Sequence, residues 1–308
     1  MILNRQDYQR KNESFSPVLA YRLGRRSGFF SEYLTMLQAI LYCLQEDIQF
    51  QLFSKDANFA MREGWTDFFE PFCPEQTSPL HLVFNPRFPT PKFRFKLRKF
   101  AAPIIKTLCD CDYLTYELWS KLRATDFDNT SIHLTAFDHQ SSAIQIYREL
   151  NQMIWRLKPE VHRHIDTLLN NINLPNSYCA VHIRSGDKIK EAAPYSIHAY
   201  MEKIKEISDT ENVLVLTDDY SNYTALVKNY PKFNFYTLES AKLKGYYHRA
   251  HKRQSPEDKQ SNYLNFLAGI EAATNAGAYL GTNSSNVSTF IRLKMDANKY
   301  HAIDRSKN

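Results

Sequence analysis

The second half of the chain alternates short apolar runs with amphipathic stretches, and this alternation limits the folds open to it. Apolar runs of strand length lie at 178–183, 213–217, 233–237 and 278–281, and a stretch with apolar residues at helical spacing follows each of them. Strands that alternate with helices are typical of a parallel sheet covered by helices on both faces. We therefore predict an α/β fold with a Rossmann-like, doubly wound parallel sheet at 176–308.

The first half begins with a predicted strand, a glycine turn and a helix. Residues 17–23 are mostly apolar, Gly24 and Gly28 bound the turn, and apolar residues recur at three- and four-residue spacing from Phe30 to Leu44. This order aims backbone N–H groups and a helix dipole at a phosphate. A plain connection between strand and helix is the alternative. Because the chain holds only eight glycines, two of them in one short turn indicate a position that needs glycine, and the two interpretations of the turn stay open at this point.

A chain of 308 residues is long enough for two domains. Amphipathic helices are predicted at 141–170, with a break near Lys158-Pro159, and Leu174-Pro175-Asn176 ends the helical region. We place the domain boundary at that point. The prediction is an N-terminal α/β domain at 1–175, which contains the glycine turn at 24–28, and a C-terminal sheet domain at 176–308.

Three predicted strands of the second half end in polar residues, and open α/β sheets bind ligands at the carboxyl edge of their strands. The three strand ends read His182-Ile183-Arg184-Ser185-Gly186-Asp187-Lys188, Thr217-Asp218-Asp219 and Thr282-Asn283-Ser284-Ser285. Arginine can grip a diphosphate with two parallel hydrogen bonds, and lysine adds a point charge. We predict that these ends bind a nucleotide. Capping of the following helices by Asp and Ser is the alternative, and the two roles are compatible.

The first of these strand ends continues in a way that resembles a known family. His182-Ile183-Arg184, Asp187-Lys188, Glu191-Ala192-Ala193 and Tyr200-Met201 follow one another. This succession resembles the α-1,6-fucosyltransferases of the eukaryotic N-glycan core type and their rhizobial nodulation relatives, which also carry a Thr-Asp-Asp and a Ser-Ser at the later strand ends. The resemblance is firm from 178 to 303 and loose from 20 to 70.

The resemblance implies a GT-B-like glycosyltransferase fold of two domains. It implies GDP-fucose as the donor substrate, inversion at the anomeric carbon, and no metal ion or other cofactor. It assigns the nucleotide sugar to the C-terminal domain and an oligosaccharide or glycoconjugate acceptor to the N-terminal one. The family expectation for the acceptor is N-acetylglucosamine, linked α-1,6. Another nucleotide sugar on the same fold, or a nucleotide- or glycan-binding protein without turnover, are the alternatives.

The resemblance also names residues for donor binding. Gly28-Phe29-Phe30 stands where the family has a glycine-aromatic donor loop, and Phe59 stands at the distance of a tyrosine near the nucleotide. The full predicted donor-binding set is Gly28, Phe29, Phe30, Phe59, His182, Arg184, Asp219, Ser284 and Ser285.

The sequence departs from the family pattern at three points. Ser185 replaces a second arginine, one residue is missing between Lys188 and Glu191, and Gly269 stands where the family has an aspartate that recognises guanine. Glu271 and Asp258 are the candidates to replace that aspartate. The identity of the donor base is therefore an open point of the prediction.

Transfer of a sugar to a hydroxyl group needs a stabilised leaving diphosphate and a base for the acceptor. We predict that Arg184, with the glycine turn and Ser285, stabilises the diphosphate. Glu191 is the predicted base, with desolvation to raise its pKa and Lys188 nearby. Asp218 and Asp219 are predicted to organise Arg184 or Lys188. His182 is the alternative base.

Residues 85–106 interleave basic and aromatic side chains. We predict a half-buried strand or loop with a solvated basic face. Peripheral contact of the basic stretch at 92–106 with a membrane surface is the alternative. Two Asp-x-Asp pairs, Asp110 with Asp112 and Asp126 with Asp128, are too short a pattern to predict a metal site.

Charge and composition exclude some partners and favour one compartment. A net charge of +6 favours an acidic ligand, but no zinc-finger, RNP-type or helix-turn-helix pattern is present, so nucleic acid is not expected as a partner. The amino terminus lacks an apolar core and no stretch approaches the roughly 18 apolar residues of a membrane span. With five cysteines, an odd number without metal-ligand spacing, we expect free thiols and a cytoplasmic protein.

Overall fold

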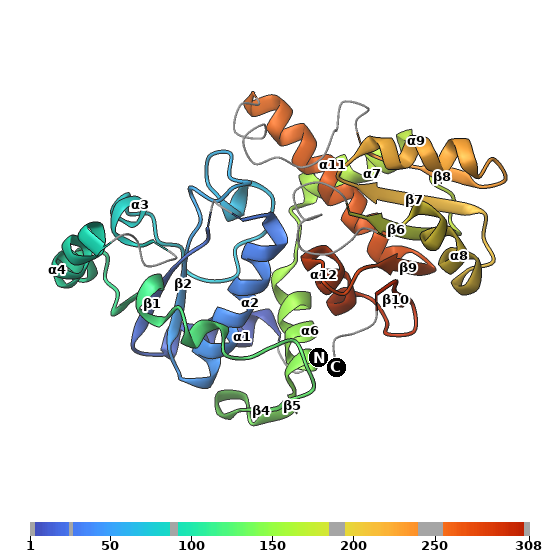
Figure 1. Cartoon of the computed structure of the whole chain (residues 1–308). Coiled ribbons are helices and arrows are strands. Elements are labelled where there is room, and N and C mark those ends of the chain that lie inside the picture. Colours follow the sequence, from blue (N-terminus) through green and yellow to red (C-terminus); the bar gives the residue numbers. More distant parts are fainter. Residues whose placement is uncertain (1–3, 25–26, 87–91, 185–194, 240–254, 305–308) are drawn as a thin grey trace. The chain divides into compact units, whose positions relative to one another are not determined.

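The computed structural model describes residues 4–24, 27–86, 92–184, 195–239 and 255–304, with the side chains of 92–97 left out. The chain forms two compact units, Met1–Lys158 and Pro159–Asn308, and each is described by itself (Figure 1). No helix among the described residues has the length and apolar character needed to cross a membrane.

The second unit contains a five-stranded sheet whose paired strands are all parallel (Figure 1). In spatial order the strands are β10 (Tyr300–Ala302), β9 (Ala278–Gly281), β6 (Cys179–Ile183), β7 (Asn212–Thr217) and β8 (Asn234–Tyr236). The chain proceeds outward from β6 to β8 and then returns to the other side of β6 with β9 and β10. The predicted doubly wound parallel sheet is confirmed, and β6 and β9 flank the point where the strand order reverses.

Helices cover both faces of this sheet. In the described part of this unit the helices are α7 (Pro159–Asn171), α8 (Ile197–Ile207), α9 (Tyr220–Asn229), α11 (Pro256–Asn275) and α12 (Asn286–Lys294). On one face, alternate strand residues such as Val181 and Val215 share a buried core with Met201 of α8 and Leu226 of α9. The side chains of the intervening strand residues point to the opposite face of the sheet, because successive side chains along a strand alternate between its two faces.

The helix α7 explains why the unit boundary differs from the one predicted at 175/176. The chain divides between Lys158 and Pro159, because α7 packs against α11 through a face that buries Val161 and Ile165. The helix break near Lys158-Pro159 was recognised in the sequence, but a break alone does not tell which unit the next helix joins.

The first unit contains a three-stranded parallel sheet with β1 at its centre. Its strands, in the order of the sheet, are β2 (Gln49–Phe53), β1 (Val18–Arg22) and β3 (Tyr113–Leu114). The larger helices are α1 (Arg5–Ser14), α2 (Phe29–Gln45), α4 (Lys92–Leu108) and α6 (Ala143–Ile154), and the shorter ones are α3 (Leu80–Phe84) and α5 (Thr115–Leu118). Three 3-10 turns (Trp65–Asp67, Lys121–Arg123 and Thr135–Phe137) and an antiparallel pair, β4 (Ser131–Leu134) with β5 (His139–Ser142), complete it. The predicted strand, turn and helix at the start correspond to β1 and α2.

The prediction of a strand or loop at 85–106 is wrong, because most of this stretch is the helix α4. The alternation of basic and aromatic residues at its start resembles the two-residue period of a strand. Further along, however, Ala102, Ile105 and Cys109 recur at helical spacing and pack with Ala20 of β1 and Leu114 of β3. These tertiary contacts favour the helix over the local pattern.

All five cysteines are free thiols, as predicted, and the structure adds that all five are buried: Cys43, Cys73, Cys109, Cys111 and Cys179.

Candidate functional site

The carboxyl ends of β6 and β9 lie side by side at the point where the strand order of the second unit reverses. Val181 of β6 is paired with Leu280 of β9 in a parallel register, so the residues that follow each strand reach the same edge of the sheet. Arg184 follows β6 directly, and Thr282 to Ser285 connect β9 with α12. The structure therefore brings together the strand ends that carry His182, Arg184, Ser284 and Ser285. Open α/β sheets bind ligands at such a switch point.

His182 is a buried histidine whose ring is incompletely paired. Its side chain is 9% exposed, and no described residue hydrogen-bonds its buried Nδ1 atom. Burial and then the neighbouring Arg184 guanidinium lower the pKa of His182 to about 4, so the ring is neutral at neutral pH and is a weak base. Buried polar atoms in proteins are nearly always paired. The open nitrogen is therefore the feature of this edge that most indicates a ligand.

The loop between β9 and α12 uses part of its backbone for internal bonds. The Asn283 N–H donates to Oδ1 of Asp304 over 2.6 Å, and the Ser284 N–H donates to Oδ2 of the same carboxylate over 3.4 Å. Ser285 is buried at the N-cap position of α12, and its side chain makes no capping hydrogen bond. In this loop, the groups able to bind an anion are the Ser285 hydroxyl and the first-turn N–H groups of α12.

Asp219 and Thr217 at the end of β7 have structural partners. Asp219 is the N-cap of α9, where its Oδ1 accepts a hydrogen bond from the Ser221 N–H at 2.9 Å. The Thr217 Oγ1 accepts from the Asp219 N–H at 3.1 Å and from the Asn222 amide at 3.0 Å. The capping alternative is thus realised for Asp219, and its role in donor binding stays a prediction.

Glu239 is a candidate that the sequence analysis missed. It follows β8, and its N–H donates to the Thr237 Oγ1 at 3.2 Å, which itself donates to the Val215 carbonyl of β7 at 2.9 Å. Burial, followed by repulsion from the neighbouring Asp218 carboxylate, raises the pKa of Glu239 to about 7. A carboxyl group that titrates near neutrality at a ligand-binding edge is typical of functional sites. The signal was available in the sequence, because Glu239 lies just after the third predicted strand (233–237) of the same sheet.

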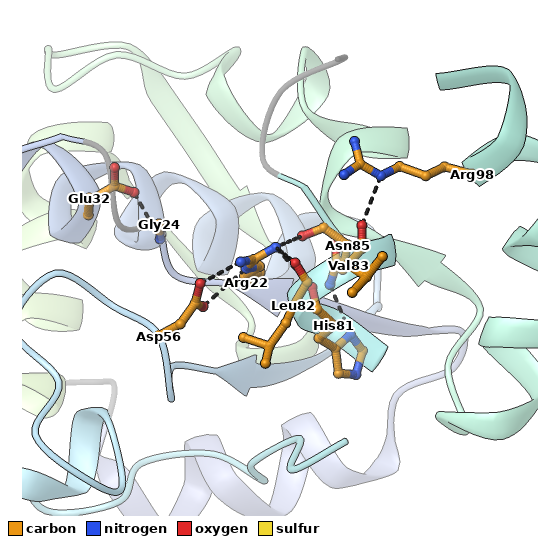
Figure 2. A network of polar contacts seen from close by, with 9 residues as sticks. All are labelled: Arg22, Gly24, Glu32, Asp56, His81, Leu82, Val83, Asn85 and Arg98. Carbon is orange, nitrogen blue, oxygen red and sulfur yellow. Dashed lines mark hydrogen bonds and ion pairs between the residues drawn. The ribbon is translucent and has the colours of Figure 1, made fainter. Parts of the chain in front are cut away.

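The glycine turn of the first unit already holds a carboxylate of the protein. Glu32 of α2 is 1% exposed. Its Oε2 accepts a hydrogen bond from the Gly24 N–H at 3.0 Å, and its Oε1 accepts one from the Ser27 N–H at 3.3 Å. The contact with Gly24 is visible in Figure 2. Two N–H groups of the turn therefore point at a side chain rather than standing open for a phosphate. Gly28 is the N-cap of α2, and its contact with a donor stays a prediction.

The aromatic residues predicted to contact the nucleotide lie in the core of the first unit. Phe29, Phe30 and Phe59 are 8%, 3% and 2% exposed. The ring of Phe29 lies 5.1 Å from that of Phe30, 5.1 Å from that of Phe59 and 5.9 Å from that of Trp155. Packing alone accounts for these positions, and a contact with the nucleotide stays a prediction.

Arg22 at the end of β1 is a buried cation that the sequence analysis did not single out. Its guanidinium forms two hydrogen bonds with the Asp56 carboxylate and donates to the carbonyls of His81, Leu82 and Asn85 at 2.9, 3.1 and 3.2 Å, as Figure 2 shows. Because its nitrogens are taken up by the protein, Arg22 holds α3 onto β1 and is not available to a phosphate.

The Asp-x-Asp pairs have structural roles in part. Asp112 accepts from the Val18 N–H at 2.8 Å, and Asp128 accepts from the Thr130 N–H at 2.9 Å. Within the described ranges, no group of three or more His, Cys, Asp or Glu residues is arranged to hold a metal ion.

Comparison with known proteins finds relatives in structure rather than in sequence. No protein-family model matches the chain, and no curated protein does either. A solved structure of NodZ α-1,6-fucosyltransferase soaked with GDP-fucose matches with a TM-score of 0.52 and 14% identity over 91% of this chain and 93% of that chain. A mutant of Arabidopsis thaliana FUT1 in complex with GDP matches with a TM-score of 0.52 and 11% identity over 98% of this chain and 76% of that one. An apo form of POFUT1 matches with a TM-score of 0.51 and 10% identity over 93% and 97%.

The chain has a GT-B-like fold. This confirms the fold class expected from the sequence, and the identities of 10% to 14% limit the conclusion to the fold. Within the GT-B-like fold, the described candidate residues His182, Arg184 and Ser285 belong to the switch point of the second unit. The predicted base Glu191 and the predicted Lys188 lie outside the described residues.

Proposed function

We propose that the protein is a glycosyltransferase that transfers fucose from GDP-fucose to a hydroxyl group of a glycan. The observation that carries the proposal is the buried Nδ1 atom of His182, which has no hydrogen-bond partner among the described residues, beside Arg184 and the N-terminus of α12. A neutral ring nitrogen, a guanidinium and a helix N-terminus form a suitable environment for a diphosphate. The fold supports the choice of donor, since a structure of similar fold was soaked with GDP-fucose.

The proposed reaction breaks the bond between the anomeric carbon of fucose and the diphosphate oxygen, and the bonding electron pair stays with the diphosphate. The acceptor oxygen attacks from the opposite side, which inverts the anomeric configuration, and its proton passes to a carboxylate. Arg184 and the Ser285 hydroxyl stabilise the charge that develops on GDP. Glu191 is the proposed base, and Glu239, with a pKa of about 7, is a described carboxyl group of the second unit suited to exchange a proton near neutral pH.

A transfer assay tests the proposal. GDP-fucose and a panel of glycans that includes reducing-end N-acetylglucosamine are incubated with the protein, with and without a chelator, and the products are analysed by mass spectrometry and NMR. We expect a fucosylated product with an α-1,6 linkage, an inverted anomeric configuration, and an undiminished rate in chelator. Absence of any fucosylated product across the panel, while GDP binds, would leave a nucleotide-binding protein without turnover.

Gly269 favours a second candidate, a transferase of the same fold with a different nucleotide sugar. A Cβ atom at Gly269 of α11 would lie 3.7 Å from Leu216 Cδ2, an ordinary contact, so packing around the first side-chain atom does not require glycine at this position. Melting curves with GDP, UDP and ADP separate the two candidates, because a ligand that binds the native state raises the melting temperature. GDP is expected to raise the melting temperature most. A larger rise with UDP or ADP would show that the donor carries a base other than guanine.

A further inference from the structure

Exposed apolar side chains gather on two neighbouring helices of the first unit. Leu82 and Val83 of α3 are 44% and 54% exposed, and Phe100, Ile104 and Leu108 of α4 are 82%, 62% and 65% exposed. The two helices are in contact and lie together at the left edge of the first unit in Figure 1. The other exposed large hydrophobic residues in the described part of the chain, Tyr195 and Val227, belong to the second unit. We call the five residues the α3–α4 face.

The α3–α4 face is distinct from the stripe that attaches α4 to the unit. Ala102 and Ile105 are both 5% exposed and pack with the sheet, whereas Phe100, Ile104 and Leu108 recur every four residues on the outer side. The second half of α4 therefore carries apolar residues on two sides. An apolar stripe of this kind, left open to water on a soluble protein, typically marks an interaction site.

Polar contacts fix the two helices in place. The Arg98 Nε donates to the Val83 carbonyl at 2.8 Å, which ties α4 to α3. Arg22 in turn donates to the carbonyls of His81, Leu82 and Asn85 and ties α3 to β1, as Figure 2 shows. The face is thus held by buried and part-buried contacts of Arg22 and by one exposed contact of Arg98, and binding to it needs little further ordering of the backbone.

The charge around the face indicates the kind of partner. The sequence of α4 contains Lys92, Arg94, Lys96, Arg98, Lys99 and Lys106 and no acidic residue. Of the acidic residues that follow, Glu117 pairs with Lys106 and Asp112 accepts from the Val18 N–H, while Asp110 lies beyond the end of the helix. Lysine is depleted in protein–protein interfaces. Basic residues beside exposed Phe, Ile and Leu on one helix are typical of helices that lie on anionic lipid.

We propose that the α3–α4 face docks on the surface of a membrane that contains anionic lipid. Phe100, Ile104 and Leu108 enter the boundary between headgroups and acyl chains, and the exposed Lys99 pairs with lipid phosphates. The contact is peripheral. The proposal does not depend on the function proposed above.

Vesicle sedimentation of the full chain tests the proposal. The probes are vesicles of phosphatidylcholine alone and of phosphatidylcholine with about a third phosphatidylglycerol. The wild type is expected to bind the anionic vesicles and to lose binding as salt rises. The double variant Phe100→Ser/Ile104→Ser is expected to bind them at least about tenfold more weakly, and Lys99→Glu about fivefold more weakly. The control Val227→Ser removes an exposed apolar residue of the second unit and is expected to bind as the wild type does.

Three results would overturn the proposal. The first is equal sedimentation with neutral and anionic vesicles, and the second is unchanged binding of both the double variant and Lys99→Glu. The third is a dimer, detected by light scattering without lipid, that dissociates in the double variant while vesicles fail to bind; the face would then be a self-association surface. Melting curves check that each variant is folded. If the double variant is not folded, the vesicle binding of Lys99→Glu, which changes an exposed residue, tests the proposal by itself.

Discussion

Two carboxylates of the protein accept hydrogen bonds from backbone N–H groups where the sequence favours a phosphate. Glu32 accepts from the Gly24 and Ser27 N–H groups, and Asp304 accepts from the Asn283 and Ser284 N–H groups. Motif reasoning identifies loops that are able to bind an anion. It does not tell whether the anion is a ligand or a distant side chain of the same chain. In the second unit the groups left for a diphosphate are therefore side chains and the start of α12.

The contact of Glu32 with the glycine turn predicts a difference between two glycines. A Cβ atom at Gly24 would lie 2.3 Å from Glu32 Oε2, whereas a Cβ atom at Gly28 would meet nothing within 4 Å. Because Glu32 is buried and bonded to the turn, it cannot move aside without losing those bonds. We expect Gly24→Ala to lower the free energy of unfolding by about 1–2 kcal/mol and the control Gly28→Ala to change it by less than about 0.5 kcal/mol. Urea unfolding measures both, and equal values would contradict the contact.

The pKa of Glu239, raised from 4.5 to about 7, predicts a pH-dependent stability. The folded state binds this proton more tightly than the unfolded state, so the native state loses stability as pH rises from about 4.5 through about 7. Glu239→Gln removes the cost of charging the group. It is expected to raise the free energy of unfolding by about 2 kcal/mol at pH 8 and by little at pH 4.

Urea unfolding at the two pH values provides the measurement for Glu239→Gln. The control is Glu211→Gln, which changes an exposed carboxyl group of the same unit and should have no pH-dependent effect. A difference between wild type and Glu239→Gln that is the same at pH 4 and pH 8 would show that the pKa of Glu239 is not raised.

At the scale of elements, the sequence predicts long and fully patterned segments well and short or locally ambiguous ones poorly. The apolar strands β6, β7 and β9 have near-continuous apolar sequence because both faces of their sheet are covered. In contrast, β10 spans only Tyr300–Ala302 and gives no apolar run. The start of α4 has the alternation of a strand, and only contacts with β1 and β3 reveal the helix.

Arg22 links elements, and its removal is expected to destabilise the first unit. Arg22→Ala leaves the half-buried Asp56 carboxylate without its partner and frees the carbonyls at the end of α3. We expect a loss of about 3–5 kcal/mol in the free energy of unfolding. The control Arg10→Ala breaks an exposed ion pair with Asp7 and should cost about 0.5 kcal/mol or less. A loss at Arg22 no larger than that at Arg10 in urea unfolding would contradict the role given to the network.

At the scale of the whole molecule, the fold is retained where the sequence is not. A GT-B-like fold over 91% of the chain accompanies 14% identity to the NodZ structure, because the burial pattern of strands and helices is enough to specify the layers. Among the residues that carry the resemblance, His182 and Arg184 lie at the end of β6, whereas Tyr200 and Met201 are buried in α8 and pack in the core of the second unit. The alternation of strands and helices was enough to predict the fold of the second unit. The position at which the unit begins could not be predicted, because it depends on the packing of α7 against α11.

The unit boundary gives a prediction for isolated fragments. Residues 159–308 are expected to fold with a cooperative transition, since they retain α7 against α11. Residues 176–308 lack the buried Val161 and Ile165 and are expected to be less stable by about 3–6 kcal/mol. Thermal and urea unfolding of the two fragments compare them directly. Equal free energies of unfolding for the two fragments would show that the boundary lies at 175/176, as predicted from the sequence.

The central claim is that the switch point of the second unit binds the diphosphate of the donor through Arg184. Calorimetric titration of GDP into the wild type, Arg184→Ala and Arg163→Ala, a control that removes an exposed arginine of α7, tests it most directly. The account predicts binding to the wild type and to the control, and at least about tenfold weaker binding to Arg184→Ala with an unchanged melting temperature. Equal affinity of all three proteins for GDP, or no affinity in any, would contradict it.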